Sequence, residues 1–119
     1  MAQDRKTQRI AMKGWVAISD SGKKRLLRGC VSDVSFKGIC VYAGRVLRLG
    51  TSVRITLEFF GQERLVSEKE LKGSVAWAFK HPAISLFGIL FHEPVTQEKF
   101  PALYEFLDKA TRKRSAKRR

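Results

Sequence analysis

The sequence is short of acidic residues, cysteines and long apolar runs. Its 119 residues include 11 Asp and Glu against 24 Lys and Arg, which gives a formal net charge of +13. No stretch approaches the roughly 20 apolar residues that a transmembrane helix needs, and the N-terminus lacks the apolar segment of a secretory signal. These absences argue against a membrane span, a secreted disulfide scaffold and a multidomain enzyme, and we expect a cytoplasmic protein.

The residue types that support catalysis or metal binding are also scarce. Cys30 and Cys40 match no zinc or redox spacing and lie in apolar, strand-like stretches, so we expect two reduced thiols in the core. His81 and His92 are the only histidines, and neither has a partner at metal-ligand spacing. No Walker, Rossmann or G-x-S-x-G motif occurs. The sequence therefore predicts a protein that is not an enzyme and has no metal or cofactor.

The positive charge is concentrated at the C-terminus. Residues 109–119 carry seven basic residues and no acid, whereas the rest of the chain holds 17 basic and 11 acidic residues, a net of +6. Because like charges repel one another, we expect a disordered tail over residues 111–119. Such a tail can be a solvated end, or it can attract a polyanion, so nucleic acid is a possible but unfavoured partner.

Most of the chain has the pattern of short β-strands. Apolar and polar residues alternate over 53–59 and again over 71–79, which is typical of strands with one buried face. Shorter candidates are 15–19, 26–32, 38–43 and 84–91, and turn residues separate them. From Thr96 onward the apolar spacing becomes helical. The pattern predicts an all-β fold, a six-stranded antiparallel β-barrel with a C-terminal α-helix that covers one end.

Two short motifs indicate a binding site. Arg5 and Arg9 form an R-x-x-x-R, and after 23 intervening residues Asp33, Ser35 and Gly38 form a D-x-S-x-x-G. Guanidinium groups bind phosphate oxygens and the guanine O6/N7 edge in a bidentate manner. A carboxylate can accept from guanine N1–H and N2–H₂, and a glycine lets a ligand or strand approach closely. Together these residues fit a guanine nucleotide.

A purely structural interpretation of the same residues is open. Asp33 and Ser35 can close a turn through side-chain-to-backbone hydrogen bonds, while Arg5 and Arg9 remain solvated. Trp77 has two interpretations as well. Its alternation with Val75 places it in the core by default, but at the mouth of a site it could stack on a base.

The paired motifs resemble those of the PilZ domain family. The resemblance continues in Gly73-Ser74-Val75-Ala76-Trp77 and in Phe87-Gly88-Ile89-Leu90-Phe91, and it covers most of residues 5–110. It implies a split-barrel fold that binds cyclic di-GMP, a bacterial second messenger. Carried over residue by residue, Arg5 and Arg9 would hold phosphates and a guanine edge. Asp33, Ser35 and Gly38 would form the opposing surface for the other guanine. Trp77 is a further candidate contact through base stacking rather than through the resemblance.

The residue patterns and the resemblance together predict a domain organisation and a role. We expect a flexible lead over residues 1–10 that orders on ligand binding, a barrel with its helix over 11–110, and the tail over 111–119. The implied role is a receptor or adaptor that passes the cyclic di-GMP signal to an effector protein of the motility, biofilm or polysaccharide machinery. Two alternatives compete with it: a basic nucleic-acid-binding barrel, and a PilZ-like adaptor that binds no nucleotide.

Overall fold

A computed structural model of the chain describes residues 5–20, 26–61 and 63–117. Seven strands and one helix follow one another along it. They are β1 (Ile10–Ala11), β2 (Gly14–Asp20), β3 (Leu26–Val34), β4 (Gly38–Ala43), β5 (Ser52–Phe60), β6 (Leu65–Phe79), β7 (Ser85–Phe91) and α1 (Pro101–Lys117).

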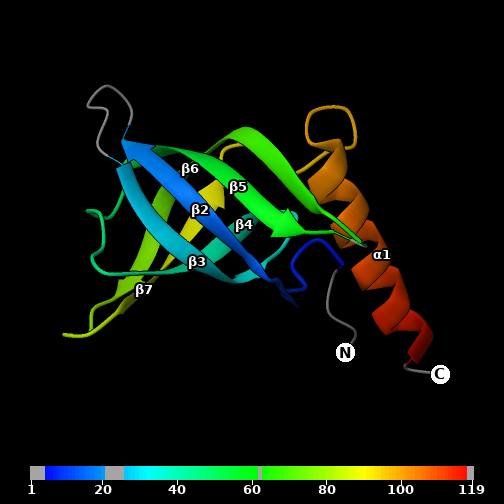
Figure 1. Ribbon diagram of the computed structural model, residues 1–119, viewed down its shortest axis with the longest axis horizontal. Helices are drawn as coiled ribbons and strands as arrows, with labels where there is room; N and C mark the ends of the chain where they lie inside the picture. Colours follow the sequence, from blue (N-terminus) through cyan, green and yellow to red (C-terminus); the bar gives the residue numbers. More distant parts are fainter. Residues whose placement is uncertain (1–4, 21–25, 62, 118–119) are drawn as a thin grey trace.

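The strands form one closed antiparallel barrel. Their order is β1-β3-β2-β5-β6-β7-β4, and an additional pairing between β3 and β4 closes the ring of six long strands. The predicted six-stranded barrel with a C-terminal helix is therefore confirmed, and Figure 1 shows α1 at one end of it. The two-residue strand β1 was not expected. It pairs with the end of β3, with Ile10 opposite Val34 and Ala11 opposite Asp33.

Alternating burial along the strands builds the barrel core. In β5, Val53, Ile55, Leu57 and Phe59 are almost fully buried, as their period of two predicts. Equivalent residues of the other strands complete a single apolar cluster inside the barrel. The outward positions between them are free to carry polar groups or to contact a ligand.

Strand β6 departs from this simple alternation. The pairing with β7 shifts between Val75 and Trp77, which lie opposite Ile89 and Gly88, respectively. This irregularity places one extra residue, Ala76, in β6, so the side chains that follow change faces. Val75 is buried, but Trp77 is only half-buried and Phe79 is exposed. The default assignment of Trp77 to the core is thus wrong, because the bulge interrupts the period of two.

Helix α1 begins at Pro101, a residue whose fixed φ suits the first helical position. The sequence suggested a start at Thr96. In the structure the Thr96 hydroxyl instead accepts from the Lys99 N–H at 3.3 Å in the preceding turn. The Glu68 side chain on β6 takes over the role of a helix cap, accepting from the Leu103 N–H at 3.0 Å. This long-range cap fixes the helix N-terminus on the barrel.

Apolar side chains of α1 pack the helix against the barrel. Leu103 and Leu107 are fully buried, and Phe106 packs edge-on against Phe59 with ring centroids 5.4 Å apart.

The helix continues through residues 111–117, which were expected to belong to the basic tail, while residues 118–119 lie outside the described part. In the described part of the chain, no helix combines the length and apolar character needed to cross a membrane.

The cysteines also differ from expectation. Cys40 is buried as predicted, but Cys30 is exposed. Cys30 lies on the outward-facing row of β3, between buried Val31 and inward-facing Gly29, so strand alternation directs its thiol away from the core. The apolar residues around Cys30 in the sequence therefore did not predict its exposure correctly.

Candidate functional site

The short strand β1 brings the two motifs of the sequence together. Because Ala11 lies opposite Asp33, the residues just before it run past the turn that follows β3. Arg9 consequently faces Asp33, with 4.0 Å between its Nε and the carboxylate Oδ1. Asp33 also accepts from the Ser32 hydroxyl at 3.1 Å. A cation from the lead and an anion from the barrel thus stand side by side at the surface.

Ser35 organises the turn between β3 and β4. Its hydroxyl oxygen accepts from the backbone N–H groups of Lys37 and Gly38, at 3.1 and 3.2 Å, and its own N–H donates to the Gly38 carbonyl at 2.8 Å. This is the turn-closing role that the sequence left open. The Ser35 hydroxyl can still donate one hydrogen bond, and a ligand can accept it.

A pocket of about 300 Å³ opens beside this turn. Arg9, Asp33, Ser35, Gly38 and Trp77, five of the six residues singled out from the sequence, line it. The rest of its wall comes from Thr7, Lys37, Ile39, Cys40, Ala76, Gly88, Ile89 and Leu90. A second cavity of about 500 Å³ lies between β6 and the segment before α1 and holds none of the six.

Trp77 forms one wall of the pocket because Gly88 leaves room for it. The two residues lie opposite each other on β6 and β7, and a Cβ atom on residue 88 would overlap the indole ring. The ring therefore rests on the backbone of β7, half-buried, with part of its surface available to a planar ligand. This placement matches the alternative in which Trp77 lies at the mouth of the site.

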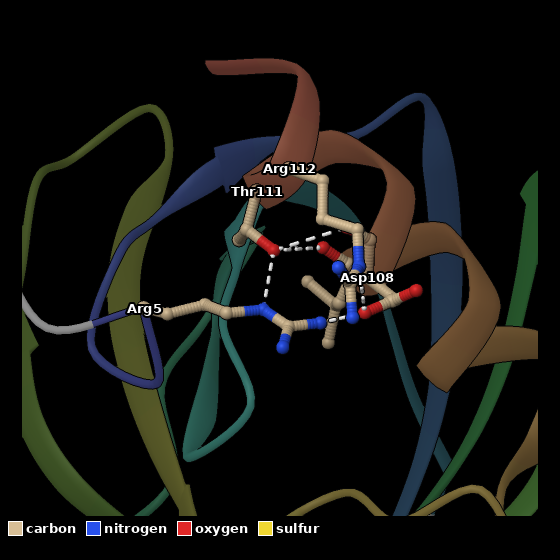
Figure 2. A network of polar contacts seen from close by, with 5 residues as sticks. Arg5, Asp108, Thr111 and Arg112 are labelled. Carbon is tan, nitrogen blue, oxygen red and sulfur yellow. Dashed lines mark hydrogen bonds and ion pairs between the residues drawn. The ribbon is translucent and has the colours of Figure 1, made fainter. Parts of the chain in front are cut away.

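Arg5 is the predicted site residue that does not line the pocket. Its guanidinium forms an ion pair with Asp108 and donates from Nε to the Thr111 hydroxyl at 2.9 Å. Figure 2 shows this network, in which Arg112 also donates to the Asp108 carboxylate, at 2.9 Å. The guanidinium carbon lies 5.3 Å from the centre of the Phe36 ring, a cation–π distance. In this structure, Arg5 thus connects the lead to α1.

Phe36 places Arg5 next to the pocket although the guanidinium points elsewhere. It sits in the D-x-S-x-x-G turn between Ser35 and Lys37, which both line the pocket. Its buried ring packs edge-on against Tyr104 of α1, with centroids 5.7 Å apart. The turn therefore has the pocket on one side and the contact between Arg5 and the helix on the other.

Burial and charge set the state of the thiol in the pocket wall. Desolvation raises the pKa of Cys40 above its ordinary value, and the neighbouring Asp33 carboxylate raises it further. The thiol consequently stays protonated at neutral pH and is a poor nucleophile. Within the described residues, no group of three or more His, Cys, Asp or Glu side chains is arranged to hold a metal ion. The pocket wall also offers a cation, a carboxylate and an aromatic face, from Arg9, Asp33 and Trp77.

Sequence reasoning missed several residues of the pocket wall. Gly88 offered a usable signal, because a glycine inside an apolar strand often marks close approach by a side chain or a backbone. Lys37, Cys40 and Leu90 gave none, since they occupy ordinary strand and turn positions. Only the pairing of β4 with β7, which sets Cys40 opposite Gly88 and Gly38 opposite Leu90, brings them to one place.

Comparison with known proteins identifies the family. The model of the PilZ domain matches residues 3–108, so the chain belongs to the PilZ domain family. PilZ domains are binding and adaptor modules, typically for cyclic di-GMP, rather than enzymes.

Among solved structures, the chain is similar to the inhibitor of motility MotI/DgrA of Bacillus subtilis. The TM-score is 0.71 at 20% sequence identity, and the match covers 99% of this chain but 55% of that one. The similarity supports the barrel fold, and the chain spans just over half the length of this neighbour. No curated protein matches the sequence.

Proposed function

We propose that the protein is a cyclic di-GMP-binding adaptor that acts in the bacterial cytoplasm on an effector of motility, biofilm or polysaccharide production. The observation that carries the proposal is the convergence of Arg9, Asp33, Ser35, Gly38 and Trp77 on one pocket of about 300 Å³. These residues come from three separate parts of the chain, namely the lead, the 33–38 motif and β6, and they supply the groups that a guanine dinucleotide requires.

Each side chain has a distinct role in this proposal. Arg9 donates to a phosphate or to the guanine O6/N7 edge, since its planar fork matches both. Asp33 accepts from guanine N1–H and N2–H₂ once Arg9 turns from it to the ligand. Trp77 stacks on a base, a contact worth roughly 1–3 kcal/mol in other nucleotide-binding proteins.

Calorimetric titration with cyclic di-GMP tests the proposal directly. We expect saturable binding, with GTP and a short oligonucleotide binding at least tenfold more weakly at physiological salt. Backbone amide shifts should change at residues 33–40, 76–77 and 88–90. Equal binding of the oligonucleotide, weakened steeply by salt, would instead support the basic nucleic-acid-binding barrel. Absence of binding to all three compounds would support an adaptor without a nucleotide.

Arg5 is proposed to change partners when the ligand binds. In the described structure it holds Asp108 and Thr111 on α1, yet it lies beside the turn that borders the pocket. A dianionic ligand can recruit Arg5 only if it binds the guanidinium more tightly than Asp108 does. The ion pair with α1 thus opposes recruitment of Arg5 to the site.

Asp108→Asn is expected to tighten cyclic di-GMP binding about threefold to tenfold, because the substitution weakens the competing hold on Arg5. Glu105→Gln is the matched control. It removes the same charge from the same helix, but Glu105 pairs with Lys109 rather than with Arg5. Parallel calorimetric titrations of the two variants make the comparison. A common change in both variants, or weaker binding in Asp108→Asn, would contradict the exchange of partners.

A further inference from the structure

The outer face of β4, β7 and β6 carries an unusual set of exposed apolar side chains. Phe79 is 65% exposed and Ile84 is 48% exposed, and Tyr42 is exposed as well. Tyr42 and Phe79 lie on either side of half-buried Leu86, since both pair with it across the sheet. We call Tyr42, Phe79, Ile84 and Leu86 the apolar face. Patches of this kind on a small protein commonly mark contact sites.

The apolar face adjoins the ligand pocket. Leu86, Gly88 and Leu90 form the outward row of β7, while Phe87 and Ile89 between them point into the core. Gly88 and Leu90 line the pocket, and Trp77, which rests on Gly88, separates it from the apolar face. A molecule that covers the apolar face therefore lies within reach of a ligand in the pocket.

The chain segments that form the apolar face contain only basic charged residues. Residues 38–50 and 71–91, which supply β4, β7 and the second half of β6, contain no acidic residue and four basic ones. Arg45 lies three residues beyond Tyr42, Lys80 directly follows Phe79, and both are exposed, as is Arg28 on the neighbouring strand β3. An apolar centre with a cationic rim is complementary to an apolar segment flanked by Asp and Glu.

We propose that the apolar face is the docking surface for an acidic, amphipathic segment of a partner protein. The inference adds a class of partner to the proposed function, and the adaptor role of the surface depends on that proposed function. Two exposed aromatic rings supply the anchors that dominate protein–protein contacts. Ile84 and Leu86 favour a protein over a single-stranded nucleic acid, because aliphatic side chains do not stack on bases as aromatic rings do.

A set of three synthetic peptides tests the docking surface. The first is a short amphipathic helix with Leu and Phe on one face and Glu elsewhere, the second replaces Glu by Lys, and the third replaces the apolar residues by Ser. We expect only the first to bind, with saturable amide shifts at residues 42, 79, 84 and 86, and with affinity that falls as salt increases. The variant carrying Phe79→Ser and Ile84→Ser should bind it at least tenfold more weakly.

Phe60→Ser is the matched control. Phe60 is another exposed aromatic residue, 51% exposed, but it lies at the end of β5 beside Trp15, with ring centroids 6.0 Å apart. Equal binding of the basic peptide, or shifts centred on Trp15 and Phe60, would overturn the proposal. So would binding only to anionic phosphatidylglycerol vesicles or to an oligonucleotide. A dimer in sedimentation that Phe79→Ser dissociates would also overturn it, by assigning the face to a second copy of the chain.

The ligand provides an internal check on both proposals. The double variant should retain the melting temperature of the unmodified protein because both substituted side chains are exposed. It should retain the cyclic di-GMP affinity because neither residue lines the pocket. Peptide binding without any cyclic di-GMP binding would contradict the proposed function but support the docking surface. Cyclic di-GMP binding without peptide binding would contradict the docking surface alone.

Discussion

Arg9→Ala is expected to weaken cyclic di-GMP binding by about tenfold to a hundredfold, since a charge-assisted hydrogen bond contributes roughly 1.5–3 kcal/mol. Arg9 is the arginine of the R-x-x-x-R motif that lines the pocket, and its Nε lies 4.0 Å from the Asp33 carboxylate. The substitution removes the fork that would face the phosphate or the guanine edge. Calorimetric titration at fixed ionic strength measures the loss.

The control for Arg9→Ala separates specific contact from general attraction. Arg54→Ala removes the same charge from an exposed position on β5, outside the pocket. Because it lowers the net charge of +13 equally, it should change the affinity less than twofold at physiological salt, where surface charges are largely screened. Equal losses of cyclic di-GMP affinity in the two variants would show that binding depends on the overall charge, and would contradict the specific role of Arg9.

The alternating strands were predictable because each follows from local side-chain chemistry. Val53 to Phe59 alternate with polar residues, and the structure buries those apolar side chains without exception. A barrel wall needs a buried inner face and an exposed outer one, so the period of two follows directly. The motif pair also led to Arg9 and Asp33, which the short strand β1 brings together.

The position of Arg5 could not be predicted from the motif. Its partners Asp108 and Thr111 are 103 and 106 residues away in sequence, on a helix whose docking depends on Leu103, Leu107 and the Glu68 cap. Nothing local distinguishes the environment of Arg5 from that of Arg9. A motif indicates which residue types can meet a ligand, whereas tertiary packing determines where each side chain lies.

The bulge in β6 was the second feature beyond the reach of periodicity. One extra residue at Ala76 turns Trp77 and Phe79 outward, although the uninterrupted pattern would direct them inward with Val75. The same irregularity therefore supplies the aromatic wall of the pocket and the most exposed ring of the apolar face. The proposed ligand site and the proposed docking surface have a common structural origin, and this explains why they adjoin.

Gly38→Ala is expected to destabilise the fold by about 1–3 kcal/mol, the usual cost of forcing extra atoms into a packed site. A Cβ atom on residue 38 would stand 2.5 Å from the Ile89 carbonyl oxygen, which belongs to the backbone of β7 and cannot swing aside. Strands β4 and β7 would have to separate where they border the pocket. The melting temperature should fall by roughly 5–15 °C, as calorimetry or circular dichroism can measure.

Gly44→Ala supplies the matched comparison, because it adds the same methyl group one residue beyond the end of β4. A Cβ atom there meets nothing within 4 Å, and the backbone is not in the left-handed region. Alanine also restricts the unfolded chain, so the change should be neutral or stabilising by up to about 1 kcal/mol. Similar melting temperatures for the two variants would mean that β4 and β7 can move apart at little cost. Gly38 would then owe its place in the D-x-S-x-x-G motif to contact with the ligand rather than to the packing of these strands.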